Sequence, residues 1–100
     1  MAKTVLAMTS LNSDGDEALE TYLAVVGPLM ESAGAKQISR YQVSENLSGT
    51  ELPQFVSIIE YPDEGAVQSV FNSPEYIALK PIRDKAFDRY DLCVISQPLR

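Results

Sequence analysis

The chain has 100 residues, a length that accommodates one small domain. Its 8 Lys plus Arg against 14 Asp plus Glu give a net charge of −6, which argues against nucleic-acid binding and against docking on anionic lipid. The lack of His excludes His-based triads and His–Cys zinc sites, and the single Cys excludes an internal disulfide. We therefore expect one domain over residues 1–100, with no cofactor, no metal and no nucleic-acid partner.

The N-terminal segment and the lone cysteine indicate a cytoplasmic protein. The apolar run after Lys3 ends at Ser10, which is too short for the hydrophobic core of a signal peptide. No apolar stretch approaches the roughly 20 residues that span a bilayer. Cys93 stands between Leu92 and Val94, a setting typical of a buried strand residue in a reducing compartment. We expect no association with a membrane.

The first third of the chain predicts a strand followed by a helix. Residues 3–11 are rich in β-branched and apolar side chains, as strands are. Asp14 and Glu17 have the spacing of a capping box, so we expect Asp14 to cap the helix. Apolar residues then recur every three or four positions up to Ala33, and Gly34 is suited to end this amphipathic helix.

Two strands and a turn are predicted in the middle of the chain. Residues 36–46 alternate loosely and predict a strand, and the Ser48-Gly49-Thr50 segment indicates a turn. Residues 54–61 form the clearest strand pattern, which Pro62 ends.

The C-terminal third predicts short helices and a last strand. Asp63 is expected to cap one helix, and the Ser73-Pro74-Glu75 sequence to begin a second. Pro81 interrupts that helix, which we expect to continue over residues 82–89, before a strand at residues 91–97. The order β-α-β-β-α-β predicts an α+β, ferredoxin-like fold with two helical segments on one face of a four-stranded antiparallel sheet.

Apolar residues occupy both faces of the predicted strands, and this pattern predicts a homodimer. Val56 and Ile58 point to one face, whereas Ile59 and Tyr61 point to the other. The helices cover only one face of such a sheet, and an antiparallel sheet with a wet face should be polar there. A second copy stacked on the open face at about 10 Å is the simplest cover, which makes the pair a dimeric α/β barrel. The alternative is a monomer whose loop folds over the open face.

Several motifs resemble the bacterial family called domain of unknown function 1330. They are Ile59-Glu60-Tyr61-Pro62, Phe71-Asn72-Ser73-Pro74-Glu75-Tyr76, Ile82-Arg83, Leu92-Cys93-Val94-Ile95 and, upstream, Tyr22-Leu23 with Val26-Gly27-Pro28-Leu29-Met30. The family's Gly-rich run around the second strand is largely lost here. The resemblance implies the dimeric α/β-barrel superfamily, which includes small monooxygenases, isomerases and stress-response proteins.

Four polar residues in apolar surroundings are the candidate ligand-binding residues: Tyr41, Glu60, Tyr76 and Arg83. Glu60 follows two isoleucines and is expected to need a cationic partner, for which Arg83 is the candidate. In the functional interpretation these residues line a pocket, with Glu60 as a candidate general base and a tyrosine as hydroxyl donor. In the structural interpretation Glu60 and Arg83 form an ion pair that fixes a helix. No motif in the sequence identifies a catalytic residue.

Two functions follow from this sequence. The first is a small-molecule-binding protein, with a pocket between sheet and helices and an activity of cofactor-independent monooxygenase-like or isomerase-like type. The second is a non-catalytic dimeric stress or interaction module whose barrel is only a scaffold. The second predicts that no cavity of about 300 Å³ or more lies beneath the helices. The fold alone does not decide between them.

Overall fold

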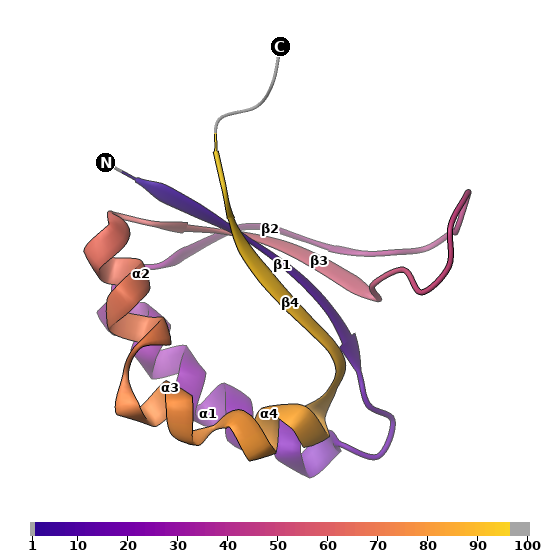
Figure 1. The fold of residues 1–100 in the computed structure, drawn as a ribbon, viewed down its shortest axis with the longest axis horizontal. Helices are drawn as coiled ribbons and strands as arrows, with labels where there is room; N and C mark the ends of the chain where they lie inside the picture. The colour runs from indigo at the N-terminus through magenta and orange to yellow at the C-terminus, as the bar shows by residue number, and fades with distance from the viewer. Residues whose placement is uncertain (1, 97–100) are drawn as a thin grey trace.

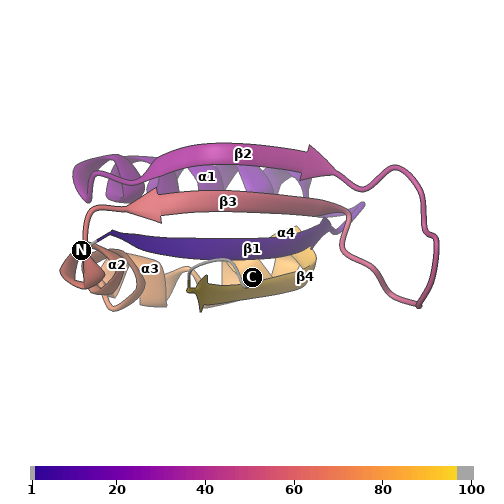
Figure 2. The ribbon, with the colours of Figure 1, turned by 90° about the horizontal axis from the view of Figure 1, so that it is seen from above.

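A computed structural model describes residues 2–96 and shows a four-stranded antiparallel sheet with all helices on one face (Figure 1). The strand order is β2-β3-β1-β4, so the first strand of the chain lies inside the sheet and β2 and β4 form its edges (Figure 2). This is the predicted ferredoxin-like arrangement. In chain order the elements are β1 (Lys3–Leu11), α1 (Asp16–Ser32), β2 (Lys36–Gln42), β3 (Phe55–Tyr61), α2 (Glu64–Phe71), α3 (Pro74–Ala78), α4 (Lys80–Ala86) and β4 (Phe87–Ile95).

The register of the sheet fixes which side chains face the helices. Val5 and Ala7 of β1 are buried, so their cross-strand partners, among them Ile59 and Leu92, also face the helical layer. Leu6 lies opposite Ile58 and Cys93, on the other face. Because side chains alternate along a strand, every second residue therefore points away from the helices.

The start of α1 differs from the prediction. Asp14 does not cap the helix: its backbone N–H instead donates to Oδ1 of Asn12 at 3.0 Å, and α1 begins at Asp16 after Gly15, where no side chain of the described part of the chain caps it. Gly15 is buried against the backbone of α4, where a Cβ would stand 2.3 Å from the carbonyl oxygen of Lys85. The close passage of the chain past α4 therefore sets this helix start.

The end of α1 is as predicted. Gly34 has φ +77°, a conformation that glycine adopts without steric cost. The N–H of Ala35 donates to the carbonyl of Met30, and that of Gly34 to the carbonyl of Glu31. This pattern is the Schellman motif, and it turns the chain from α1 into β2.

The helix caps of the C-terminal half are confirmed. Oδ1 of Asp63 accepts the N–H of Ala66 at 2.8 Å, and Oγ of Ser73 accepts the N–H of Tyr76 at 3.1 Å. Both are N-cap side chains that satisfy free N–H groups in the first turn of a helix.

The last strand begins earlier than predicted. β4 starts at Phe87, directly after α4, so the expected continuation of the helix to Arg89 is wrong. Pro81 lies in the first turn of α4, where its missing N–H costs little, and the break in the helix falls at Leu79. Pairing with the nine-residue β1, down to Leu11 opposite Phe87, extends β4 over positions that read as helical. Position 97 of the predicted strand lies outside the described residues.

The core fills the space between sheet and helices. One cluster of buried side chains centres on Val5, Tyr61 and Val70, and a second on Tyr22 and Tyr76. Within residues 2–96, no helix combines the length and apolar character needed to cross a bilayer.

Candidate functional site

A cavity of about 220 Å³ lies between the helix-facing side of the sheet and the helices. Most of its wall is aliphatic or aromatic, from both core clusters. Its polar groups include four tyrosines, Tyr22, Tyr61, Tyr76 and Tyr90, and one charged side chain, Arg40. The site is therefore an apolar chamber with phenolic hydroxyls in its wall.

The cavity opens between α1 and the edge strand β2. Three of its lining side chains are solvent-exposed, and all three lie there: Leu23 on α1, and Gln37 and Arg40 on β2. The guanidinium of Arg40 lies 4.9 Å from the centre of the Phe55 ring. A cation therefore stands at the mouth of an otherwise apolar cavity.

Three tyrosine hydroxyls form a continuous hydrogen-bonded chain. Tyr90 Oη lies 2.5 Å from Tyr22 Oη and 2.7 Å from Tyr76 Oη. The three residues come from β4, α1 and α3, so the chain of hydroxyls joins the sheet to two helices. We call these three side chains the tyrosine trio.

Arg83 of α4 adds a positive charge behind the trio. Its Nη1 donates to Tyr76 Oη at 3.1 Å, and its guanidinium carbon lies 4.9 Å from the centre of the Tyr90 ring and 5.5 Å from that of Tyr76. Arginine stacked on aromatic faces gains cation–π attraction. Arg83 therefore fixes two members of the trio at once.

Edge-to-face aromatic contacts hold the trio in place. The Tyr22 ring packs against Phe87 with centres 5.2 Å apart and planes at 82°, and the Tyr76 ring packs against Phe71 at 5.0 Å and 81°. Such pairs place the positive edge of one ring on the negative face of another. β4 begins at Phe87, directly after α4. Both Phe87 and Tyr90 of this strand therefore pack against Tyr22 of α1.

The hydroxyls of Tyr22 and Tyr90 stay protonated at neutral pH. Burial raises the pKa of Tyr22 and of Tyr90, and for Tyr90 the neighbouring Tyr22 hydroxyl raises the pKa further. Burial disfavours the charge on Arg83, but its hydrogen bond to Tyr76 and the neighbouring phenols outweigh this, so the pKa of Arg83 is raised. The site therefore combines neutral phenols with a permanent cation.

Tyr61 lines the same cavity but stands apart from the trio. Its side chain is fully buried at the end of β3, and its hydroxyl has no hydrogen-bond partner among the described residues. Its ring centre lies 6.2 Å from that of Phe71, whose ring also packs against Tyr76. Burial, with a further contribution from Tyr76, raises the pKa of Tyr61 to about 12.

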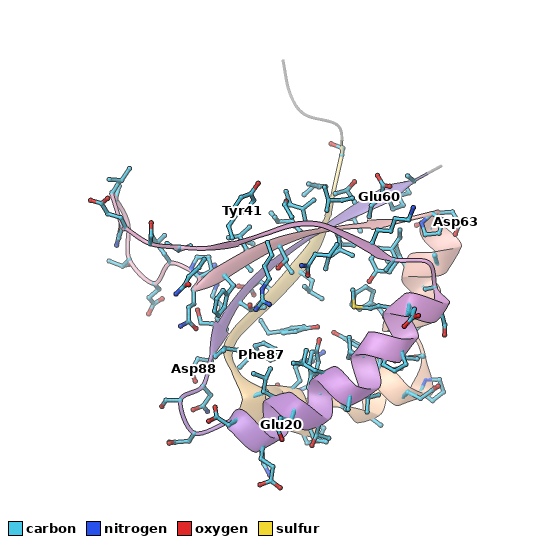
Figure 3. All side chains as sticks on the ribbon, turned by 180° about the vertical axis from the view of Figure 1, so that it is seen from behind. Glu20, Tyr41, Glu60, Asp63, Phe87 and Asp88 are labelled. Atoms are coloured by element: carbon cyan, nitrogen blue, oxygen red, sulfur yellow. The ribbon has the colours of Figure 1, made fainter. Side chains whose placement is uncertain are left out.

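The structure brings together two of the four predicted site residues. Tyr76 and Arg83 are in direct contact, as described above. Tyr41 and Glu60 point away from the helices, on the far side of the sheet (Figure 3). Glu60 lies opposite Thr4 and Lys36 and is exposed, because its neighbours Ile59 and Tyr61 take the helix-facing positions.

The predicted ion pair between Glu60 and Arg83 is therefore not formed. The salt bridges within residues 2–96 join Lys80 to Asp84 and Arg89 to Asp91. The partners of Arg83 are phenols rather than a carboxylate.

Sequence reasoning missed Tyr22 and Tyr90 as site residues. Tyr22 stood in the apolar stripe of the first helix, where an aromatic residue reads as core. Tyr90 fell just before the predicted last strand. The available signal was the number of tyrosines, since the chain has five and four of them line the cavity.

The fold matches solved structures with a ferredoxin-like fold. A protein of unknown function from Rhodopseudomonas palustris is 27% identical, with a TM-score of 0.80 over 99% of this chain and 83% of its own. A dabb family protein with a ferredoxin-like fold from Mesorhizobium loti has 13% identity and a TM-score of 0.62, over 99% and 98% of the two chains. SnoaB, a cofactor-independent oxygenase from Streptomyces nogalater, has 9% identity and a TM-score of 0.62, over 99% and 95%.

The family follows from the sequence itself. The model of the domain of unknown function DUF1330 matches residues 4–97, so the chain belongs to this family. Among curated protein sequences, none matches the chain. The likeness to SnoaB is one of fold, so the chemistry of this protein has to be argued from its own site.

Proposed function

We propose that this protein binds a small, largely apolar molecule in the cavity between its sheet and its helices. The cavity itself carries this proposal: about 220 Å³, with a mostly apolar wall and a few convergent polar groups. An engineered cavity of about 150 Å³ already holds benzene, so a single-ring molecule fits. The mouth between α1 and β2 supplies a route of entry.

The chemistry that the site supports is stabilisation of negative charge on an oxygen atom. The hydroxyls of Tyr22 and Tyr90 are neutral donors in an apolar environment, where a hydrogen bond to a developing oxyanion is strong. Enolate-type oxygens develop both in isomerisation beside a carbonyl and in cofactor-independent oxygenation, the two activities expected from the resemblance. No carboxylate lines the cavity within the described residues, so no general base is assigned to the site.

The proposed molecule is a homodimer paired through the open face of the sheet. Apolar side chains on that face are only half-buried or exposed within one chain. They come from three neighbouring strands and include Leu6, Met8, Val56, Ile58, Cys93 and Ile95. A contiguous apolar surface of this kind marks an interface, and a second identical sheet matches its shape. The expected burial of Cys93 is wrong for a single chain, in which this residue is exposed. A cytoplasmic location is part of the proposal, because a single cysteine forms no disulfide within the chain.

The alternative function, a non-catalytic dimeric stress or interaction module, is favoured by one observation. The cavity is smaller than the roughly 300 Å³ at which ligand pockets begin. In that case the trio would serve only to join α1, α3 and β4.

Titration with toluene separates the two functions. We expect saturable chemical-shift changes in the methyl groups of cavity residues such as Val26 and Met30. Ala7→Leu fills the cavity from β1 and should abolish these changes. Ala24→Leu, the same substitution on an exposed position of α1, should leave them intact. Saturable binding that persists in Ala7→Leu, or no binding to the unaltered protein, would refute the proposal.

A native mass spectrum of the gently purified protein complements the titration. A dimer mass with a discrete additional mass would support both parts of the proposal. A monomer mass at all concentrations would refute the dimer.

A further inference from the structure

We propose that the natural ligand of the cavity is an organic anion, a carboxylate on a single ring or a chain of similar size, whose oxygen accepts a hydrogen bond from the tyrosine trio. This inference rests on the proposed binding function and specifies its ligand class. It follows from a count of hydrogen atoms in the trio and from the charges around the cavity.

The trio has one more hydroxyl hydrogen than its own bonds use. Three phenols carry three hydrogens, and the Tyr22–Tyr90 and Tyr76–Tyr90 hydrogen bonds use two of them. The bond between Arg83 and Tyr76 uses a hydrogen of the guanidinium, because arginine only donates. One phenolic O–H is therefore left to donate outside the trio, whichever way the two bonds run.

All three of these tyrosines line the cavity, so the remaining hydrogen belongs to a residue of the cavity wall. If Arg83 donates to Tyr76, Tyr76 to Tyr90 and Tyr90 to Tyr22, the free hydrogen is that of Tyr22. A donor in a mostly apolar chamber without an acceptor costs about 1–3 kcal/mol. An acceptor oxygen on a ligand removes this cost.

The positively charged side chains near the cavity favour an anion as the ligand that supplies the acceptor oxygen. Arg83 stacks on two trio rings and Arg40 stands at the mouth. Neither is in a salt bridge among the described residues, and no Asp or Glu lines the cavity. Among the described residues, Arg40 is thus the one charged side chain in the cavity wall, and Arg83 adds a second positive charge behind the trio. The phenol oxygens also have free lone pairs, but a cationic ligand would meet two positive charges and no carboxylate.

The pKa shifts agree with this geometry. Burial raises the pKa of Tyr22 and Tyr90, so both remain donors across the physiological range. The hydrogen bond between Arg83 and Tyr76 keeps the guanidinium charged. The site thus offers donors and positive charge, the features that a carboxylate requires.

Three single-ring probes of similar size test the inference: benzoate, benzylamine and toluene, each titrated by NMR at neutral pH. We expect benzoate to bind at least about tenfold more tightly than toluene, and benzylamine no more tightly than toluene. A tenfold difference corresponds to about 1.4 kcal/mol. Equal binding of benzoate and toluene would overturn the anion inference and leave the proposed function standing. If none of the three binds, both fail.

Substitutions locate the recognition. Tyr22→Phe and Arg83→Gln should lower the affinity for benzoate about tenfold and leave that for toluene unchanged. Tyr41→Phe is the matched control, because it removes a phenolic oxygen from an exposed side chain on the far side of the sheet, outside the cavity wall. Tyr41→Phe should keep the affinity for benzoate; an equal loss in this variant would overturn the assignment to the trio.

Arg40→Gln keeps the test decisive if a trio variant fails to fold. Arg40 is exposed, so its replacement leaves the core intact. We expect a severalfold weaker binding of benzoate and a smaller dependence of that binding on salt concentration. Unchanged affinity and unchanged salt dependence would show that the mouth does not attract anions.

Discussion

The hydroxyls of Tyr22 and Tyr90 lie 2.5 Å apart, although the two residues are separated by 68 positions in the chain. This contact joins the first helix to the last strand, and Tyr76 extends it to α3. The same atoms that hold the helices on the sheet therefore form the polar wall of the cavity. Stability and ligand binding are therefore coupled, and a substitution in the trio is expected to change both the free energy of unfolding and the affinity for a ligand.

Tyr90→Phe removes the central hydroxyl of the trio. Tyr22 and Tyr76 each lose a hydrogen-bond partner in a part-buried environment. We expect a loss of about 1–3 kcal/mol in the free energy of unfolding, measured by urea denaturation. Tyr61→Phe is the control, since the Tyr61 hydroxyl has no partner within residues 2–96 to lose, and its removal should be neutral or stabilising. Equal losses in the two variants would contradict the hydrogen-bonded chain.

The raised tyrosine pKa values predict a loss of stability at high pH. A phenol in an unfolded chain titrates near pH 10. Burial raises the folded-state pKa of Tyr61 to about 12 and also raises those of Tyr22 and Tyr90. The unfolded state therefore releases protons that the native state retains. The stabilisation is complete below a pH of about 10 and is lost as the pH rises through the folded-state values.

Urea unfolding at a series of pH values, with phenolate absorbance as a second signal, checks this prediction. The free energy of unfolding should fall above a pH of about 10, and phenolate should appear together with unfolding. Tyr61→Phe should show a shallower fall, because one of the three shifted groups is absent. A flat profile up to a pH of about 12 would contradict the burial of these hydroxyls.

Two glycines in or beside α1 predict opposite effects of the same substitution. At Gly15 a Cβ would stand 2.3 Å from the carbonyl oxygen of Lys85, so Gly15→Ala should destabilise by about 1–3 kcal/mol. At Gly27, inside the helix, a Cβ meets nothing within 4 Å, so Gly27→Ala should stabilise by about 0.5–1 kcal/mol. Thermal unfolding of the two variants measures both. A stabilised Gly15→Ala would show that α1 and α4 do not pack this closely.

Local signals in the sequence were enough to predict the order of the elements and most helix ends. The caps at Asp63 and Ser73 and the glycine at position 34 act within a few residues, so the sequence reveals them directly. The start of β4 was not predicted correctly, because residues 82–89 have charged side chains at helical spacing and were expected to continue the helix. Pairing with β1 overrides that pattern.

The site was predicted only in part because both sheet faces are apolar. Strand alternation separates Glu60 from Ile59 and Tyr61, but the sequence does not show which of the two faces the helices cover. The structure places Ile59 and Tyr61 under the helices. Glu60 therefore points to the opposite face of the sheet and is not part of the site. Tyr22 and Tyr90 meet only through the tertiary fold, which no spacing in the sequence expresses.

The open face of the sheet predicts an oligomer that a single charge disrupts. Ile58 lies in β3, opposite Leu6 of β1, on the face away from the helices. In a two-fold pair, Ile58→Lys places two charges in one apolar interface without partners. We expect the dissociation constant to rise at least about 100-fold, measured by sedimentation velocity over a concentration series.

Ile77→Lys is the matched control for this prediction. Ile77 is 61% exposed on α3, in the helical layer, so the same substitution there should leave the dimer intact. Cys93 supplies a second readout, since it lies opposite Leu6 on the same open face and is exposed within one chain. It should react slowly with a thiol reagent in the unaltered protein and in Ile77→Lys, and rapidly in Ile58→Lys. Rapid reaction in all three proteins would mean that the face stays open and that the sheet does not pair with a second copy.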